Sequence, residues 1–152
     1  MSTVYRICRR RYAPFDGEGA RRQSGRWNHD GTPVVYTAGS LSLAALEVLA
    51  HTDASLLPAD LVYVAAEIPA AVKITHYTLQ DMPADWQQNP APMSTKDLGQ
   101  QWVQAAPTAV LAVPSTLVPI EMNYLLNPVH REFKKIRLHL PEEFLFDARL
   151  LG

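Results

Sequence analysis

A single carboxylate stands out in an apolar stretch of the chain. Residues 41–51 read Leu-Ser-Leu-Ala-Ala-Leu-Glu-Val-Leu-Ala-His, and Glu47 carries the only acidic side chain among them. A carboxylate removed from water costs several kcal/mol unless it is paired. We therefore expect Glu47 to face an arginine, a polar cleft or a ligand, and helical spacing puts it on one face with Ala44 and His51. A structural ion pair would satisfy the same pattern, so the residue alone leaves both interpretations open.

Two further side chains of chemical interest precede this carboxylate. In the run Ser24-Gly25-Arg26-Trp27-Asn28, Arg26 follows a glycine, which lets backbone approach a ligand closely. Tyr36 lies in the next apolar segment, where its ring would either stack on a heterocycle or fill the core with its hydroxyl at the rim. The alternative for Arg26 is an exposed loop side chain.

The basic residues are distributed unevenly along the chain. Seven of the 14 lie in the first 26 positions, and Asp16 and Glu18 are the only acidic residues there. These seven are Arg6, Arg9, Arg10, Arg11, Arg21, Arg22 and Arg26. Guanidinium groups bind phosphate and carboxylate in a planar, bidentate way. Because the net charge is -1, a small anionic ligand fits this cluster better than DNA or a membrane surface does, although a solvated basic face is also possible.

The remaining candidate is a serine far downstream. Ser115 directly follows a predicted buried strand, but its flanks Val-Pro-Ser-Thr-Leu lack the G-x-S-x-G elbow of serine nucleophiles. A hydrogen-bonding role or a turn serine fits better. Gly17-Glu18-Gly19 lacks the third glycine of a dinucleotide fingerprint, and the five scattered histidines make a metal site improbable.

Length and composition favour one globular domain. The 152 residues are 47% apolar and 19% charged, which suits a single domain over residues 1–152 with one core. The lone Cys8 excludes an internal disulfide. No stretch reads as a signal peptide or reaches the roughly 20 apolar residues of a membrane helix, so we expect a cytoplasmic protein.

Local patterns predict the elements that would hold these side chains. Helices are expected over Leu41–His51, with Ser40 as N-cap, and over Ser94–Ala106, with Ser94 and Asp97 as a capping box. Strands are expected over Val4–Cys8, Pro33–Ala38, Leu61–Ile68, Val72–Tyr77, Ala109–Val113, Ile136–Leu140 and Glu143–Phe146. Residues 9–31 and Pro83–Pro92 read as loops, and Glu121–Pro128 as a compact turn or short helix. Clustered strands of this kind predict an α+β fold with a mixed or antiparallel sheet.

Several stretches together resemble one known family. They are Tyr5-Arg6-Ile7, Phe15 to Ala20, Gly25-Arg26-Trp27-Asn28, Val35 to Ala38, Ala44 to His51, Val113-Pro114-Ser115, Glu121 to Pro128 and Phe146 to Leu150. The chain resembles RES-domain proteins, the toxin halves of RES–Xre toxin–antitoxin pairs. The family is named after an Arg, a Glu and a Ser, which here would be Arg26, Glu47 and Ser115. Ser24 and Ala148 depart from the glycine and proline that these proteins often have, which bears only on local loop shape.

The resemblance implies a fold related to ADP-ribosyltransferase toxins and NAD as substrate, with no further cofactor and no metal. The catalytic residues would be Arg26, Glu47 and Ser115, and the NAD-binding residues Arg6, Arg26, Tyr36, Glu47 and Ser115. The implied activity breaks the nicotinamide–ribose bond by hydrolysis or phosphorolysis, which would deplete cellular NAD and arrest growth.

Two other functions stay open at this point. The chain would otherwise transfer ADP-ribose from NAD to a protein, or act without catalysis as the binding partner of an antitoxin. The resemblance implies an Xre-like helix-turn-helix antitoxin and no direct contact of this chain with nucleic acid. A homodimer within the antitoxin complex is compatible with it.

Overall fold

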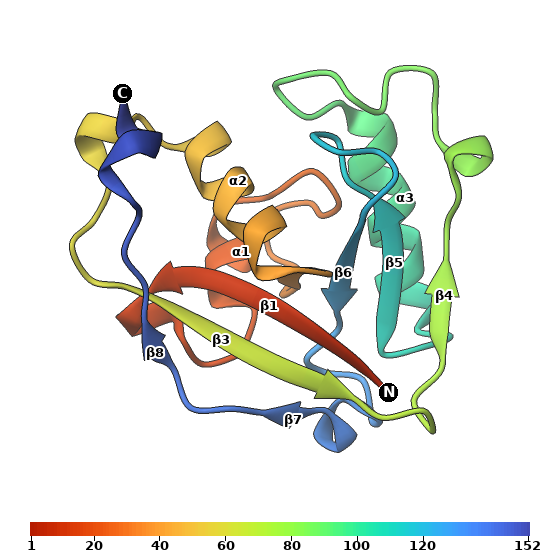
Figure 1. The fold of residues 1–152 in the computed structure, drawn as a ribbon. Coiled ribbons are helices and arrows are strands. Elements are labelled where there is room, and N and C mark those ends of the chain that lie inside the picture. Colours follow the sequence, from red (N-terminus) through yellow and green to blue (C-terminus); the bar gives the residue numbers. More distant parts are fainter.

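The computed structural model describes all 152 residues and shows a curled sheet with helices packed against it (Figure 1). The strands are β1 (Ser2–Arg9), β2 (Val35–Ala38), β3 (Leu61–Ile68), β4 (Ile74–His76), β5 (Val110–Pro114), β6 (Met122–Leu126), β7 (Arg137–Leu138) and β8 (Glu142–Glu143). The α-helices are α1 (Glu18–Arg22), α2 (Leu41–His51) and α3 (Met93–Ala105). Single 3₁₀ turns occupy Arg10–Tyr12, Ala54–Leu56, Leu79–Asp81, Phe133–Lys135 and Ala148–Leu151.

One mixed sheet runs through the molecule in the order β4-β5-β6-β2-β1-β3-β7, and β8 also pairs with β3. Every neighbouring pair is antiparallel except β4 and β5, which α3 connects in parallel. This is the predicted α+β class with a mixed sheet. Sequence order and sheet order differ, so β2 lies between β1 and β6 although most of the chain separates β2 from β6.

The core fills both faces of the sheet. One group of buried side chains includes Val4, Val35 and Leu126, and a second includes Trp27, Trp102 and Leu125. Strand β5 is buried at all five positions, which agrees with the apolar run that predicted a buried strand there. The site described below lies where β2, β6 and α2 meet.

Helix α2 begins and ends where the sequence predicts. The Ser40 hydroxyl accepts the N–H of Leu43 at 3.1 Å, so it satisfies one of the free donors of the first turn. The helix packs on β1 and β2 and buries Leu43 and Ala44. Its outer side is open, since Leu46 is 47% exposed, so the helix is buried on fewer sides than its apolar sequence suggests.

Helix α3 lacks the capping box that the sequence predicts. It begins at Met93 after Pro92, and Ser94 donates instead to Asp85 Oδ1 at 2.5 Å. Asp97 contacts His29 at 2.7 Å rather than a backbone N–H of the first turn. The loop that precedes the helix therefore competes successfully for the predicted cap.

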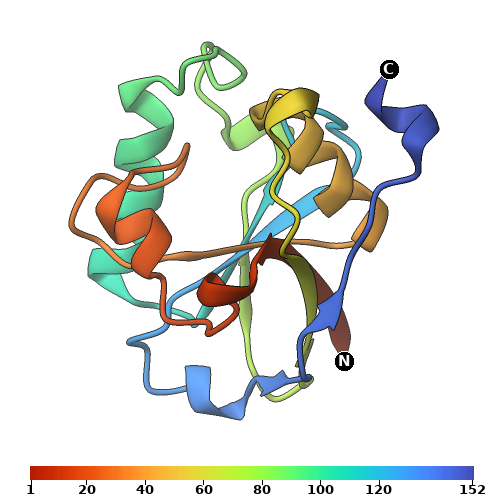
Figure 2. The same ribbon diagram turned by 90° about the vertical axis from the view of Figure 1, so that its left-hand side faces the viewer.

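Helix α3 packs closely on the segment that carries Arg26, and Figure 2 shows the two on the same side of the molecule. A Cβ atom at Gly99 would lie 1.8 Å from the carbonyl oxygen of Trp27, so only glycine permits this approach. Lys96 Nζ donates to Ser24 Oγ at 2.6 Å, and Gln100 Oε1 accepts the N–H of His29 at 3.3 Å. The helix thus fixes the loop from Ser24 to His29.

The structure corrects a second prediction and refines others. Glu121–Pro128 is not a turn or short helix, because Met122–Leu126 forms β6 between β2 and β5. The predicted loop over residues 9–31 contains α1, whose five residues form barely more than one turn. The predicted closing strands shrink to two residues each in β7 and β8. No helix is both long enough and apolar enough to cross a membrane.

Candidate functional site

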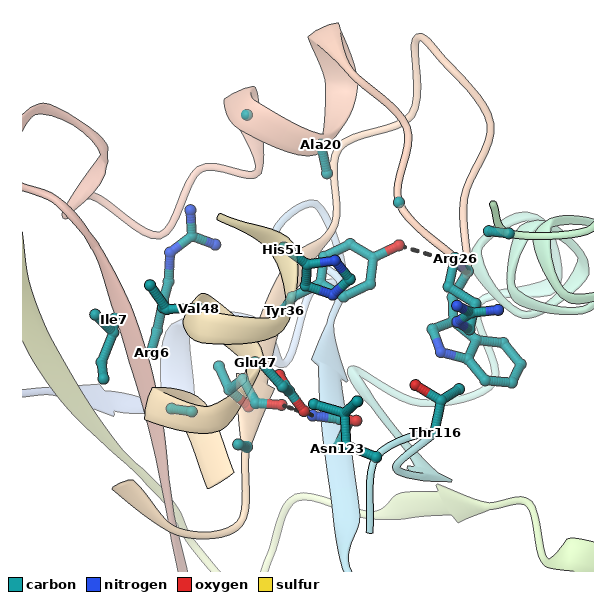
Figure 3. A pocket seen from close by; sticks show the side chains of 18 of the residues that line it. Arg6, Ile7, Ala20, Arg26, Tyr36, Glu47, Val48, His51, Thr116 and Asn123 are labelled. Carbon is teal, nitrogen blue, oxygen red and sulfur yellow. Dashed lines mark hydrogen bonds between the residues drawn. The ribbon is translucent and has the colours of Figure 1, made fainter. Parts of the chain in front are cut away.

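One cleft has a volume of about 630 Å³ and is lined by residues from β1, α1, β2, α2, α3 and β6 and from the loops that connect such elements. Arg6, Arg26, Tyr36 and Glu47 all line it, as the sequence analysis expects of a shared site. Figure 3 shows Arg6 and Arg26 on opposite sides of the view, with Tyr36 and Glu47 between them. The chain therefore brings four of its five predicted site residues together.

Glu47 points from α2 toward β6, where its partner is a neutral side chain. Its Oε1 accepts a hydrogen bond from Asn123 Nδ2 at 2.6 Å, and no cation forms an ion pair with it (Figure 3). Burial raises the pKa of the Glu47 carboxyl above its ordinary value, and the Asn123 hydrogen bond opposes that rise. The sequence analysis allowed Glu47 to face either a polar cleft or a cation in a structural ion pair. The structure shows the polar cleft and no ion pair.

Arg26 is fixed by backbone carbonyl groups rather than by a carboxylate. Its Nη1 donates to Trp86 O at 3.0 Å and to Gln88 O at 2.7 Å, both in the predicted loop Pro83–Pro92. Partial burial lowers the pKa of Arg26, but a guanidinium stays charged at neutral pH. The side chain is thus oriented with its positive charge uncompensated.

The turn that carries Arg26 is held by Asn28 and Tyr36. Asn28 is fully buried, and its Oδ1 accepts from Gly25 N at 2.9 Å and from the Tyr36 hydroxyl at 2.5 Å. Its Nδ2 lies within hydrogen-bond distance of the carbonyl groups of Ala20, His29 and Thr32.

The Tyr36 hydroxyl also accepts the N–H of Trp27 at 3.0 Å, and burial raises the pKa of the phenol well above its ordinary value. The hydroxyl therefore stays protonated and holds the Arg26 turn to β2, while the ring lines the cleft.

Arg6 is the second cation without a counter-charge. Its Nε–H is buried and has no hydrogen-bond partner, and the side chain forms no ion pair. The guanidinium approaches Gly19 in α1, because a Cβ there would lie 4.0 Å from Arg6 Nη2. An unpartnered buried donor is uncommon in a folded protein, and this N–H is available to a ligand or to water.

Ser115 does not line the cleft. The residue is fully buried, and its Oγ accepts the N–H groups of Leu117 at 3.1 Å and Val118 at 3.2 Å. This is the turn serine that the sequence leaves open as an alternative. Its neighbours Thr116 and Leu117 do line the cleft, so Ser115 shapes the turn that presents them, and its contact with a substrate stays a prediction.

Sequence reasoning missed three residues of this site. Asn28 and Asn123 both lie in stretches quoted for the family resemblance, which is the signal that pointed toward them. Lys96 lines the cleft from α3 and had no signal beyond its charge. Nowhere in the chain do three or more His, Cys, Asp or Glu side chains gather as a metal site requires.

The chain thus forms a curled mixed sheet, and its cleft holds two guanidinium groups without a counter-charge and one carboxylate. Its fold matches that in a structure described as the crystal structure of the M. tuberculosis MbcT–MbcA toxin–antitoxin complex, with a TM-score of 0.75 over 94% of this chain and 84% of the matched chain. The two sequences are 18% identical, so this likeness concerns the fold alone.

The family follows from sequence. Residues 3–147 match the RES domain, and the chain belongs to the RES-domain family. A protein named Toxin Res from Yersinia enterocolitica is 41% identical over 97% of this chain and 98% of its own length. One named Prs ADP-ribosylating toxin from a Sphingobium species is 37% identical over 90% and 86%. A Toxin Res from Photorhabdus laumondii is 35% identical over 97% and 96%. The predicted family and toxin class are confirmed.

Proposed function

We propose that this toxin consumes NAD by breaking the bond between nicotinamide and ribose. The observation that carries the proposal is the charge arrangement in the cleft. Arg6 and Arg26 have no counter-anion, while Glu47 is ionisable and pairs with neither. A substrate with a pyrophosphate and a ribose centre that becomes positive would complement both kinds of charge.

The bond that breaks joins the ribose anomeric carbon to the pyridinium nitrogen. The bonding electron pair leaves with nicotinamide, which departs neutral and needs no general acid. The ribose passes through an oxocarbenium-like state, whose positive charge the Glu47 carboxylate stabilises while it accepts a ribose hydroxyl. Water then adds and loses a proton to give ADP-ribose, or phosphate adds to give its phosphorylated form.

The other cleft residues would bind and orient the substrate. Arg26 and Arg6 would hold the pyrophosphate, and the ring of Tyr36 would flank nicotinamide, since its hydroxyl is already bonded within the protein. Ser115 would either hydrogen-bond ribose or the nicotinamide amide directly, or support that contact by shaping the turn that lines the cleft. Only one carboxylate serves the reaction, which disfavours a two-carboxylate glycosidase mechanism.

The test is a time course of NAD loss by purified protein freed of antitoxin, with and without inorganic phosphate. Wild-type protein is expected to consume NAD, and Glu47→Gln to lose turnover by about a hundredfold or more, because the carboxylate charge disappears while the hydrogen bond from Asn123 remains. Full NAD consumption by Glu47→Gln would refute the assignment.

A second pair of variants tests the binding role of Arg26. Arg26→Ala is expected to raise KM for NAD more than it lowers kcat, because it removes a contact made in both ground and transition states. The matched control is Arg22→Ala in the same segment, whose side chain is 71% exposed and pairs with Glu18. An unchanged KM in Arg26→Ala would contradict the phosphate role.

A second candidate function is protein ADP-ribosylation, favoured by the 37% identical relative named Prs ADP-ribosylating toxin. The same cleavage would then pass the ribosyl centre to a protein side chain. Mass spectrometry of a candidate target incubated with toxin and NAD separates the two, because hydrolysis yields free ADP-ribose and transfer yields a modified protein. Absence of both products would revive a non-catalytic role as the partner of an Xre-like antitoxin, with or without a toxin homodimer in the complex.

A further inference from the structure

Asn123 occupies a position that the sheet itself fixes. It lies on β6 between two neighbours, with its Cα opposite Ala38 of β2 and Val113 of β5. Its side chain reaches α2 on the sheet face where Glu47 projects (Figure 3). A residue paired on both sides in the middle of a sheet has little freedom to move, so it can hold a neighbouring side chain in one position.

The Asn123 amide donates with both of its hydrogens. Nδ2 bonds Glu47 Oε1 at 2.6 Å and the carbonyl oxygen of Thr37 at 3.2 Å. Both neighbours are acceptors, so the amide orientation follows from the hydrogen bonds around it and the NH₂ group must face them. The hydrogen bond to Thr37 O therefore fixes the orientation of the Asn123 amide, and the amide in turn fixes Glu47 Oε1.

The identity of this donor matters because it carries no charge. The titratable side chains that line the same cleft are Tyr5 and Arg6 from β1, Tyr36 from β2, His51 from α2, Lys96 from α3, and Arg26. None of the cations among them pairs with Glu47. A cationic partner would fix the carboxylate equally well but would cancel the charge that a developing oxocarbenium ion requires.

We infer that Asn123 is the positioning residue of Glu47: it holds Oε1 in place, keeps the full negative charge, and leaves Oε2 free for the substrate. The catalytic part of this inference rests on the proposed NAD-cleaving function. The structural part concerns only the two side chains and stands independently of any substrate.

The structural part is tested by titrating Glu47 directly. NMR of protein labelled with ¹³C at the glutamate carboxyl group, assigned with Glu47→Gln, gives the pKa of Glu47 in wild type and in Asn123→Ala. Loss of a hydrogen bond to the charged form is expected to raise that pKa. The matched control is Asn127→Ala directly after the same strand, a buried asparagine that accepts the N–H of Val129 and forms no hydrogen bond with Glu47. It is expected to lower the melting temperature and leave the pKa of Glu47 unchanged.

The catalytic part is tested by the pH dependence of NAD turnover. A hydrogen bond to a charged group contributes about 1.5–3 kcal/mol, so Asn123→Ala is expected to lower kcat by about ten- to a hundredfold with KM within about threefold of wild type. The acid limb of its pH profile moves to higher pH. Asn123→Asp has nearly the same shape but sets a second carboxylate against Glu47, so it falls below Asn123→Ala at neutral pH.

The outcomes separate the two levels of the proposal. An unchanged pKa of Glu47 in folded Asn123→Ala, or a kcat and acid limb equal to wild type, would overturn the role of Asn123. Absence of NAD loss in wild type would overturn the proposed function, and the NMR titration would still decide whether Asn123 controls Glu47. Should Asn123→Ala fail to fold, Asn123→Thr, whose branched side chain suits a strand and is too short to hold the same bond, gives the same readouts.

Discussion

The hydroxyl of Tyr36 is the most informative single group to remove, because it ties the Arg26 turn to the sheet. Tyr36→Phe keeps the ring on the cleft wall and deletes two hydrogen bonds, one from Trp27 N at 3.0 Å and one to Asn28 Oδ1 at 2.5 Å. Asn28 Oδ1 retains the N–H of Gly25, whereas the N–H of Trp27 is left without an acceptor in a residue only 3% exposed.

The size of the effect follows from that orphaned donor. A buried group left unsatisfied costs about 1–3 kcal/mol, and we take about 2 kcal/mol for Tyr36→Phe. For a domain of this size about 1 kcal/mol shifts the melting temperature by about 2–4 °C, so the expected decrease is about 4–8 °C. If about half of the cost falls on the geometry of the turn, the apparent affinity for NAD decreases about fivefold through Arg26.

Thermal unfolding and steady-state NAD turnover measure the two effects. The control is Tyr124→Phe on β6, whose hydroxyl has no hydrogen-bond partner in the protein and which stays outside the cleft lining. A melting temperature of Tyr36→Phe within about 1 °C of wild type would refute the structural argument. A clear decrease in melting temperature with unchanged KM would show that the turn does not position Arg26.

Two further predictions concern Glu47 and Ser115. Folding raises the pKa of Glu47, so the folded protein binds this proton more tightly and the free energy of unfolding decreases as the pH rises from the ordinary value of 4.5 through the raised pKa. Gln at position 47 cannot titrate, so denaturant unfolding should show that Glu47→Gln is more stable than wild type near pH 7 and loses this advantage near pH 4. If the free energies of unfolding of the two proteins change with pH in parallel, the burial argument is wrong. Ser115→Ala should lower the melting temperature by about 2–4 °C through two lost acceptor contacts, and should raise KM only if the turn carrying Thr116 and Leu117 moves. A large loss of kcat at an unchanged melting temperature would instead indicate direct contact of Ser115 with substrate.

The sequence correctly predicted the elements whose formation depends on residues within the same segment. The apolar run of α2 with Ser40 before it, and the long apolar strand β3, were predicted with the bounds that the structure shows. Glu121–Pro128 was misread because β6 has no alternating pattern of its own and forms by pairing with β2 and β5. The capping box of α3 failed because Ser94 bonds Asp85, a competition that the helix sequence does not contain.

The residues of the candidate site also fall into those that residue type identifies and those that only long-range contacts reveal. Residue type identified Glu47, Arg6 and Arg26, because unpaired charge in an apolar or Arg-rich context is visible in sequence. Asn123 had no signal beyond its place in a stretch that resembles the family, since its importance depends on a contact with Glu47 across 76 residues of chain. One of the two interpretations of Tyr36 put its hydroxyl at the rim of the core. The hydroxyl instead bonds the Arg26 turn, a role that only the packing of β2 on that turn reveals.

The late position of β6 in the chain has a consequence for the order in which the cleft is assembled during synthesis. During synthesis at about 5–20 residues per second, Arg26, Tyr36 and Glu47 emerge well before Met122–Leu126. Until then β2 lacks its β6 neighbour, and Glu47 lacks the side chain that holds it. Strand pairings so distant in sequence are also slow to form. A nascent chain that ends before Met122 therefore carries every charged group of the cleft, but the cleft is complete only when β6 has paired with β2 and β5.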